Sequence, residues 1–259
     1  MKVVILAGGL GTRLSEETGI RPKPMVEIGG KPILWHIMKT YAHFGFNEFV
    51  ICLGYKGYMI KEYFANYFLH QSDVTIDLAN NKIEIHNSES ENWKVTLVET
   101  GVDTNTAGRI KKIKKYVDGE TFMLTYGDGL ANIDIAKLIA SHKKSNKMAT
   151  LTSIQLPGRF GNLDIDEQGV VKKFQEKPIG DGVWINGGFF VLNKEIFNYL
   201  EGDMNDVQWE KKPLLEIANH GQLNAYSHTG FWKCMDAIRD KIELEELWDS
   251  GKAEWKVWK

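Results

Sequence analysis

Lys2-Val3-Val4-Ile5-Leu6-Ala7, followed directly by Gly8-Gly9-Leu10-Gly11-Thr12-Arg13, is the stretch that indicates the fold. Its first six residues are almost wholly apolar and rich in β-branched side chains, which is typical of a central parallel strand covered on both faces. The glycines then break the strand and let the backbone approach a polyphosphate closely, while Arg13 supplies a fixed cation. The stretch predicts a strand, a phosphate-binding loop and a helix start.

Predicted helices and strands alternate along the rest of the chain. Apolar residues recur at helical spacing between residues 32 and 44, and residues 48–53 form the next apolar run, so the two predict a βαβ unit. The same patterns predict further helices at 56–68, 107–116, 133–145 and 236–248, and further strands at 121–126, 148–155 and 184–192. This order indicates an α/β fold with a doubly wound, Rossmann-like mixed sheet and a ligand site at its carboxyl edge.

Residues 72–99 interrupt the alternation with three short strand-like segments, and Asn80-Asn81 is suited to a tight turn between two of them. We expect a single domain over residues 1–259, with a β-rich insertion at about 72–99 and a C-terminal helical segment at 236–259. The strand-rich insertion is large for a monomer. We therefore expect it to form a homo-oligomer interface.

The net charge of −2 gives no electrostatic reason to expect nucleic acid or an anionic membrane as a partner. The chain has only two cysteines, Cys52 and Cys234, in no disulfide or zinc pattern, which fits a reducing compartment. The apolar run within residues 1–10 is too short for a membrane span. These features predict a cytoplasmic protein with no nucleic acid or membrane as partner.

Two common readings of a glycine-rich loop fail on individual residues. A dinucleotide fingerprint would need a small residue where Leu14 stands, and the next predicted strand ends in Leu53-Gly54 without a ribose-binding acid. A Walker motif fails because Lys31 is followed by Pro32 instead of Ser or Thr. A tight structural turn would explain the glycines but not Arg13.

Five ordered motifs resemble the nucleotide-sugar pyrophosphorylase family, and together they span nearly the whole chain. They are Leu6–Leu14 with Arg21-Pro22-Lys23-Pro24-Met25-Val26 and Gly30-Lys31-Pro32, then Tyr126-Gly127-Asp128-Gly129, Phe174-Gln175-Glu176-Lys177-Pro178, Asn186-Gly187-Gly188-Phe189, and Gly230-Phe231-Trp232 with Asp236. The resemblance implies a sheet of the nucleotide-diphospho-sugar transferase type and a Mg²⁺-dependent nucleotidyltransferase.

Within this family the chain looks like the cytidylyltransferase branch, which makes CDP-glucose from CTP and glucose 1-phosphate. The features that carry this are Ser15-Glu16-Glu17-Thr18, the insertion at 72–99 and the stretch Thr100–Arg109. The resemblance also implies a hexamer and a place in nucleotide-sugar biosynthesis for surface polysaccharides such as the lipopolysaccharide O-antigen. A uridylyl- or thymidylyltransferase on the same sugar phosphate, or a non-catalytic sugar-nucleotide-binding relative, remains open.

The resemblance further implies in-line attack of the sugar phosphate on the α-phosphorus of the triphosphate. Arg13, Lys23 and Asp128 are the expected catalytic residues, with Arg13 on the β- and γ-phosphates and Lys23 on the α-phosphate. Asp128 and Asp236 are the expected Mg²⁺ ligands. The expected nucleotide-binding residues are Leu6, Ala7, Gly8, Gly9, Leu10, Gly11, Thr12, Arg13, Lys23, Thr106, Arg109 and Gly127.

The residues that the resemblance assigns to the sugar phosphate are Glu176, Lys177, Asn186, Gly187, Gly188 and Trp232. Most of the candidate residues also have a plain structural interpretation. Asp236 could cap the final helix, Asp128 could cap a turn, and the glycines at 187–188 could mark a bulged strand.

Overall fold

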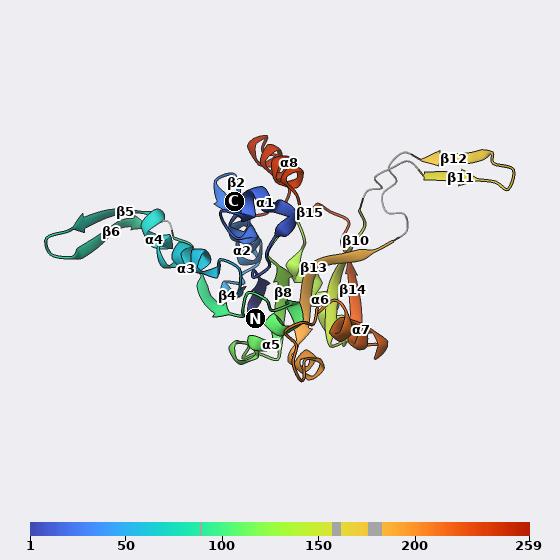
Figure 1. Cartoon of the computed structure of the whole chain (residues 1–259), viewed down its shortest axis with the longest axis horizontal. Helices are drawn as coiled ribbons and strands as arrows, with labels where there is room; N and C mark the ends of the chain where they lie inside the picture. The colour runs from blue at the N-terminus through green and yellow to red at the C-terminus, as the bar shows by residue number, and fades with distance from the viewer. Residues whose placement is uncertain (89, 157–161, 176–182) are drawn as a thin grey trace.

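We describe the chain from a computed structural model, which covers residues 1–88, 90–156, 162–175 and 183–259. Its centre is a seven-stranded sheet (Figure 1). The bounds of the strands are Val3–Leu6 (β1), Glu48–Leu53 (β4), Lys94–Glu99 (β7), Thr121–Tyr126 (β8), Ala149–Ile154 (β10), Ile185–Asn193 (β13) and Leu223–Ser227 (β14). They lie in the order β14-β10-β13-β8-β1-β4-β7.

All neighbours in this sheet are parallel except β13, which runs antiparallel to both β8 and β10. Strand β1 lies between β4 and β8, with Leu6 beside Cys52 on one side and Tyr126 on the other. The residues after β1 and β8 therefore emerge side by side at the carboxyl edge of the sheet.

Helices cover both faces of the sheet, because β1 directs alternate apolar residues to each face. Val3 and Ile5 belong to a core shared with helices α2 (Ile33–His43), α3 (Gly57–Ala65) and α6 (Ile135–Ser145). Val4 and Leu6 belong to a second core, shared with α5 (Thr106–Lys112), α7 (Lys212–Asn219) and the 3-10 helix η4 (Lys194–Tyr199). The predicted doubly wound, Rossmann-like mixed sheet is thus confirmed.

The final helix, α8 (Ile238–Asp249), and the residues after it pack against the start of α2. Trp255 is fully buried and donates its Nε1 hydrogen to Nδ1 of His36 at 3.3 Å, while Nε2 of His36 lies 2.8 Å from the carbonyl oxygen of Ile28. Burial lowers the pKa of His36 to about 4. The C-terminal segment therefore closes one end of the core around a neutral histidine.

Two further hairpins consist of β5 (Ser72–Asp77) with β6 (Lys82–Ser88), and β11 (Asn162–Ile165) with β12 (Val171–Gln175). Hairpin β5–β6 projects from the body of the molecule beyond α3 and α4 (Tyr67–His70) (Figure 1). The third segment expected in the 72–99 insertion is instead β7, the edge strand of the central sheet, paired in parallel with β4. Its alternating pattern predicts a strand but carries no information about which strand it joins.

The remaining short elements are η1 (Thr12–Leu14), α1 (Ser15–Thr18), η2 (Lys23–Met25), β2 (Glu27–Ile28), β3 (Lys31–Pro32), η3 (Lys114–Tyr116), β9 (Gly129–Ala131) and β15 (Trp232–Cys234). None of the helices in the described part of the chain combines the length and the apolar character that a membrane span needs.

Candidate active site

A cleft of about 310 Å³ opens at the carboxyl ends of β1 and β8, where the fold class places ligands. Its lining comes from five parts of the chain: the glycine loop, the segment at 23–24, the segment at 104–109, the turn after β8, and Asp236. The lining residues are Leu6, Ala7, Gly8, Gly9, Gly11, Thr12, Arg13, Lys23, Pro24, Thr104, Asn105, Thr106, Arg109, Tyr126, Gly127, Asp128 and Asp236. Leu10, which the sequence assigned to the nucleotide, is 49% exposed and lies outside this lining.

Two glycines of the loop are required by its geometry. Gly11 has a φ of +64°, a conformation that L side chains rarely adopt, and a Cβ there would lie 2.7 Å from Thr18. A Cβ on Gly8 would lie 2.1 Å from the guanidinium of Arg109. A side chain at Gly8 or Gly11 would therefore collide with Arg109 or Thr18, and the loop after β1 can adopt this backbone conformation beside the cleft only with glycine at these two positions.

Lys23 is the first residue of the short helix η2 and is flanked by two prolines. Pro22 and Pro24 restrict the backbone, and the amide of Met25 donates to the carbonyl of Pro22 at 2.8 Å. The ammonium group of Lys23 donates to Asp128 Oδ2 at 2.6 Å and to Asp236 Oδ1 at 2.7 Å. One cation is therefore held between two carboxylates from distant parts of the sequence.

The pairing of β9 with β15 brings the two aspartates together. Asp128 directly precedes β9, and its carbonyl accepts from the amide of Met235 at 2.9 Å, just beyond β15. Asp236 follows Met235, and its second carboxylate oxygen accepts from Arg13 at 2.8 Å. Its side chain does not cap α8, because the N-cap residue is Ala237 and Asp240 accepts from the amides of Asp236 and Ala237.

This cluster keeps Lys23 and Asp236 charged at neutral pH. Burial acts to lower the pKa of Lys23, but the charge of Asp128 and the hydrogen bonds to both aspartates outweigh it and raise that pKa above its ordinary value. Burial acts to raise the pKa of Asp236, yet the hydrogen bond and charge of Lys23, with Arg13, hold it below the usual value. The site thus presents fixed positive and negative charge beside the glycine loop.

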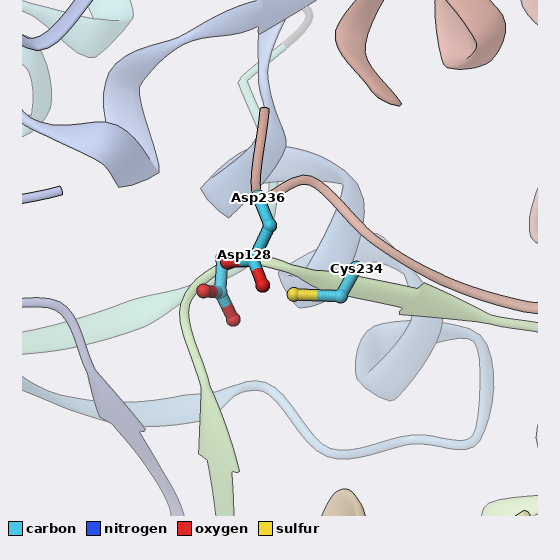
Figure 2. Close-up of side chains that lie close together, drawn as sticks. All are labelled: Asp128, Cys234 and Asp236. Atoms are coloured by element: carbon cyan, nitrogen blue, oxygen red, sulfur yellow. The ribbon is translucent and has the colours of Figure 1, made fainter. Parts of the chain in front are cut away.

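The donors at the base of the cleft fit a magnesium ion. One carboxylate oxygen from each of Asp128 and Asp236 lies within 4.8 Å of the other and of Sγ of Cys234 (Figure 2). Mg²⁺ is bound by one or two protein carboxylates together with phosphate oxygens and water, and the ammonium of Lys23 already occupies the position of a cation between these two. Cys234, the last residue of β15, was not expected at this site from the sequence.

Arg109 is buried, with 4% of its surface exposed, and the acceptors of its guanidinium among the described residues are all neutral. These are the carbonyl oxygens of Leu53, Gly101, Gly8 and Val102 and the hydroxyl of Thr100, at 2.7 to 3.1 Å. Burial lowers its pKa below the ordinary value. Arg109 lines the cleft as expected, and it also ties the glycine loop to the segment after β7.

Glu210 joins two sides of the cleft and was not identified from the sequence. One carboxylate oxygen accepts from the hydroxyl of Tyr126 at 2.6 Å, and the other accepts from the hydroxyl of Thr106 at 2.8 Å. Burial and the charge of Glu210 raise the pKa of Tyr126. An exposed glutamate outside any motif carries no signal that would reveal this contact.

The residues expected on the sugar side form a separate group beyond Tyr126. Asn186 donates to the Tyr126 hydroxyl at 3.4 Å and accepts from the amide of Gly188 at 2.9 Å. Nε1 of Trp232 donates to the carbonyl of Gly187 at 2.7 Å, which links β15 to β13. These residues do not line the cleft itself, and the expected residues Glu176 and Lys177 lie outside the described residues.

Comparison with known proteins gives matches over most or all of the chain. The profile of the nucleotidyl transferase family matches residues 2–236. The glucose-1-phosphate cytidylyltransferase of Salmonella typhi is 59% identical over 259 residues, covering 100% of both chains. A Bacillus subtilis (strain 168) protein named "Probable glucose-1-phosphate cytidylyltransferase" is 49% identical over 258 residues, again covering 100% of both.

A solved structure gives the same result for the fold. The crystal structure of HddC from Yersinia pseudotuberculosis superposes with a TM-score of 0.68 and 27% sequence identity, covering 95% of this chain and 99% of that chain. The family profile extends from the second residue to Asp236, and so includes the glycine loop, Lys23 and both aspartates. The chain belongs to the nucleotidyl transferase family.

Proposed function

We propose that the protein transfers a cytidylyl group from CTP to α-D-glucose 1-phosphate and releases CDP-glucose and pyrophosphate, in a Mg²⁺-dependent reaction. Two observations support this. The end-to-end identity of 59% to a glucose-1-phosphate cytidylyltransferase supports the choice of both substrates. The cluster of Lys23, Asp128 and Asp236 beside the glycine loop supports the reaction type, and this geometry is the observation that carries the proposal.

The glycine loop would hold the triphosphate. Its open backbone lets phosphate oxygens approach, and Arg13 is 77% exposed at its side chain, so it can turn from Asp236 toward the β- and γ-phosphates. The buried guanidinium of Arg109 would fix the loop from below and leave a positive field under the nucleotide. Thr106 would contact the nucleotide from the opposite wall.

Lys23 would act on the α-phosphate. Its side chain is 13% exposed and its backbone is restricted by two prolines, so its ammonium is positioned before substrate arrives. As the sugar phosphate attacks in line with the departing pyrophosphate, negative charge develops on the oxygens around the α-phosphorus, and Lys23 would stabilise it. Asp128 and Asp236 would hold Mg²⁺, which when bound neutralises phosphate charge.

The sugar phosphate would lie on the Tyr126 side of the cleft. Asn186, Gly187 and Gly188 form a bend whose polar groups are held by Tyr126 and Trp232. We propose that this bend contacts the hexose, with Glu176 and Lys177 contributing from the segment outside the described residues. The whole chain would act as one catalytic domain.

Hairpin β5–β6 is the proposed homo-oligomer interface, in a hexamer. An isolated two-stranded hairpin is marginally stable in water, and this one exposes Ile76, Leu78, Ile83 and Ile85, of which Leu78 is 84% exposed. Contact with a second subunit would cover these side chains. A light-scattering mass equal to one chain would contradict this. The two cysteines, which form no disulfide, fit a cytoplasmic location.

A pyrophosphate-release assay tests the function. The protein is incubated with glucose 1-phosphate, Mg²⁺ and each of CTP, UTP, dTTP, ATP and GTP in turn, and we expect CTP to be used best. Activity with dTTP or UTP alone would identify the alternative nucleotidyltransferases. Release with none of the five would favour a non-catalytic sugar-nucleotide-binding relative, although Arg13, Lys23 and Asp128 are all present in the cleft.

A further inference from the structure

Cys234 places a thiol directly beside the two carboxylates at the base of the cleft. Its Sγ and one oxygen from each of Asp128 and Asp236 all lie within 4.8 Å of one another. Figure 2 shows the three side chains, which come from the turn after β8 and from the end of β15, meeting at one place. The thiol forms no disulfide.

The position of Cys234 follows from the pairing of β15 with β9. Cys234 lies opposite Gly129 in the register, and Gly129 is the residue after Asp128. Asp236 lies two residues beyond Cys234, just past the end of β15. The half-buried thiol therefore comes from a paired strand rather than from a free loop. Mg²⁺ does not need it, since this hard ion prefers oxygen.

A thiolate with two carboxylates is a donor set for a softer ion. We propose that Asp128, Cys234 and Asp236 together form a binding site for a thiophilic divalent cation, Zn²⁺ or Cd²⁺, at the place where the nucleotidyl transfer site takes Mg²⁺. Binding of Zn²⁺ or Cd²⁺ to these three residues does not depend on the proposed function. Its consequence does rest on the proposed function, since the bound ion would exclude Mg²⁺ from the phosphates.

The geometry allows tetrahedral coordination with small movements. With a zinc–sulfur distance of about 2.3 Å and zinc–oxygen distances of about 2.0–2.2 Å, neighbouring ligand atoms around Zn²⁺ are roughly 3.5 Å apart. Donor atoms that now lie within 4.8 Å would close by about 1.3 Å at most, and water would take the fourth position. The ammonium of Lys23, on its flexible stem, would leave the carboxylates as the divalent ion replaces its charge.

The binding step balances without an oxidant. The metal–sulfur bond forms as the S–H bond breaks, the sulfur keeps the electron pair, and the proton is released to solvent. The sulfur is neither oxidised nor reduced. The bound species is a metal thiolate that carries two carboxylate ligands.

Cadmium is the probe, because a cadmium–thiolate bond has an ultraviolet charge-transfer absorption that carboxylate ligands alone do not produce. Cd²⁺ is titrated into the full chain without nucleotide or sugar phosphate. We expect the absorption to appear and to saturate at one Cd²⁺ per chain. Cys52→Ala is the matched control, since Cys52 is the only other cysteine and is fully buried in the core, so this variant should keep the absorption.

Cys234→Ala should abolish the absorption and weaken Cd²⁺ binding by at least about tenfold, since loss of even an outer-shell partner costs about 10- to 100-fold in metal affinity. Cys234→Ser, which keeps the size of the side chain, should behave alike, and far-UV circular dichroism verifies that each variant is folded. An absorption that is missing in the parent chain, or that persists without Cys234, would overturn the proposal.

Competition tests whether the site is shared. Excess Mg²⁺ should raise the apparent dissociation constant for Cd²⁺, and Asp236→Asn should raise it without removing the absorption. Cd²⁺ binding that is indifferent to both would overturn the shared site. Because no substrate is present, failure of cytidylyl transfer would leave these readouts unchanged, so the two proposals can fail separately.

Discussion

Replacing Lys23 with methionine removes the ammonium group between Asp128 and Asp236 but keeps an unbranched stem of similar length. The two carboxylates are then left facing each other within 4.8 Å. Two unit charges at that separation repel by about 3 kcal/mol at an effective dielectric constant of about 20. Their side chains are 27% and 34% exposed, so solvent screening reduces the expected loss of stability to about 1–2 kcal/mol.

Three readouts should change together in Lys23→Met. For a chain of this size the loss of stability lowers the melting temperature by about 2–8 °C in the absence of divalent ions. Added Mg²⁺ should raise the melting temperature more than it does in the parent chain, because the ion no longer competes with an ammonium for the carboxylates. Turnover with CTP and glucose 1-phosphate should fall by about 10²- to 10³-fold, the usual cost of losing one positioned charge-stabilising donor.

Lys39→Met is the matched control. Lys39 pairs with Glu91 at 2.9 Å and is 19% exposed, so the pair resembles that of Lys23 in burial, but it lies outside the cleft. This variant should lose stability without gaining a larger response to Mg²⁺ and without losing turnover. If Lys23→Met kept turnover within about threefold of the parent, or responded to Mg²⁺ as Lys39→Met does, the assignment of Lys23 to the site would be wrong.

Three more outcomes follow from the described contacts. Arg109→Met removes the donor that the carbonyl oxygens of Gly8, Gly101 and Val102 share, and should cost about 3 kcal/mol or more in urea unfolding while raising the KM for CTP; a purely local cost with unchanged KM would contradict its role under the loop. Below pH 6.5 the unfolded chain takes up a proton that folded His36, with its pKa of about 4, does not bind. Stability should therefore fall between these pH values by up to about 3 kcal/mol from this group, and His36→Asn should flatten the slope. Glu210→Gln weakens the hold on Thr106 and should raise KM more than it lowers kcat; a change in melting temperature alone would leave it no role in the cleft.

The central part of the fold was predictable because its signals are local. Residues 2–7, 48–53 and 121–126 are apolar runs between glycine- or helix-bearing segments, and each is a buried strand of the sheet. The partner of a strand is not a local property. For that reason the sequence did not place Lys94–Glu99 at the sheet edge or indicate that β13 alone runs antiparallel.

In the candidate site, too, the residues with a motif were predictable from the sequence and the contacts without a motif were not. The grouping of Lys23, Asp128 and Asp236 was expected, because the resemblance supplied their common role. The acceptors of the Arg109 guanidinium are mostly backbone carbonyls, which have no residue signature. Glu210 reaches the cleft through a segment without a motif.

The most direct test of the central claim follows both products of one reaction by phosphorus NMR. CTP and glucose 1-phosphate are mixed with Mg²⁺ and either the parent chain or Asp128→Asn. We expect the signals of CDP-glucose and pyrophosphate to grow in equal amounts with the parent chain, and at least about a hundredfold more slowly with the folded variant. Pyrophosphate without CDP-glucose, or equal rates for the two proteins, would contradict this expectation.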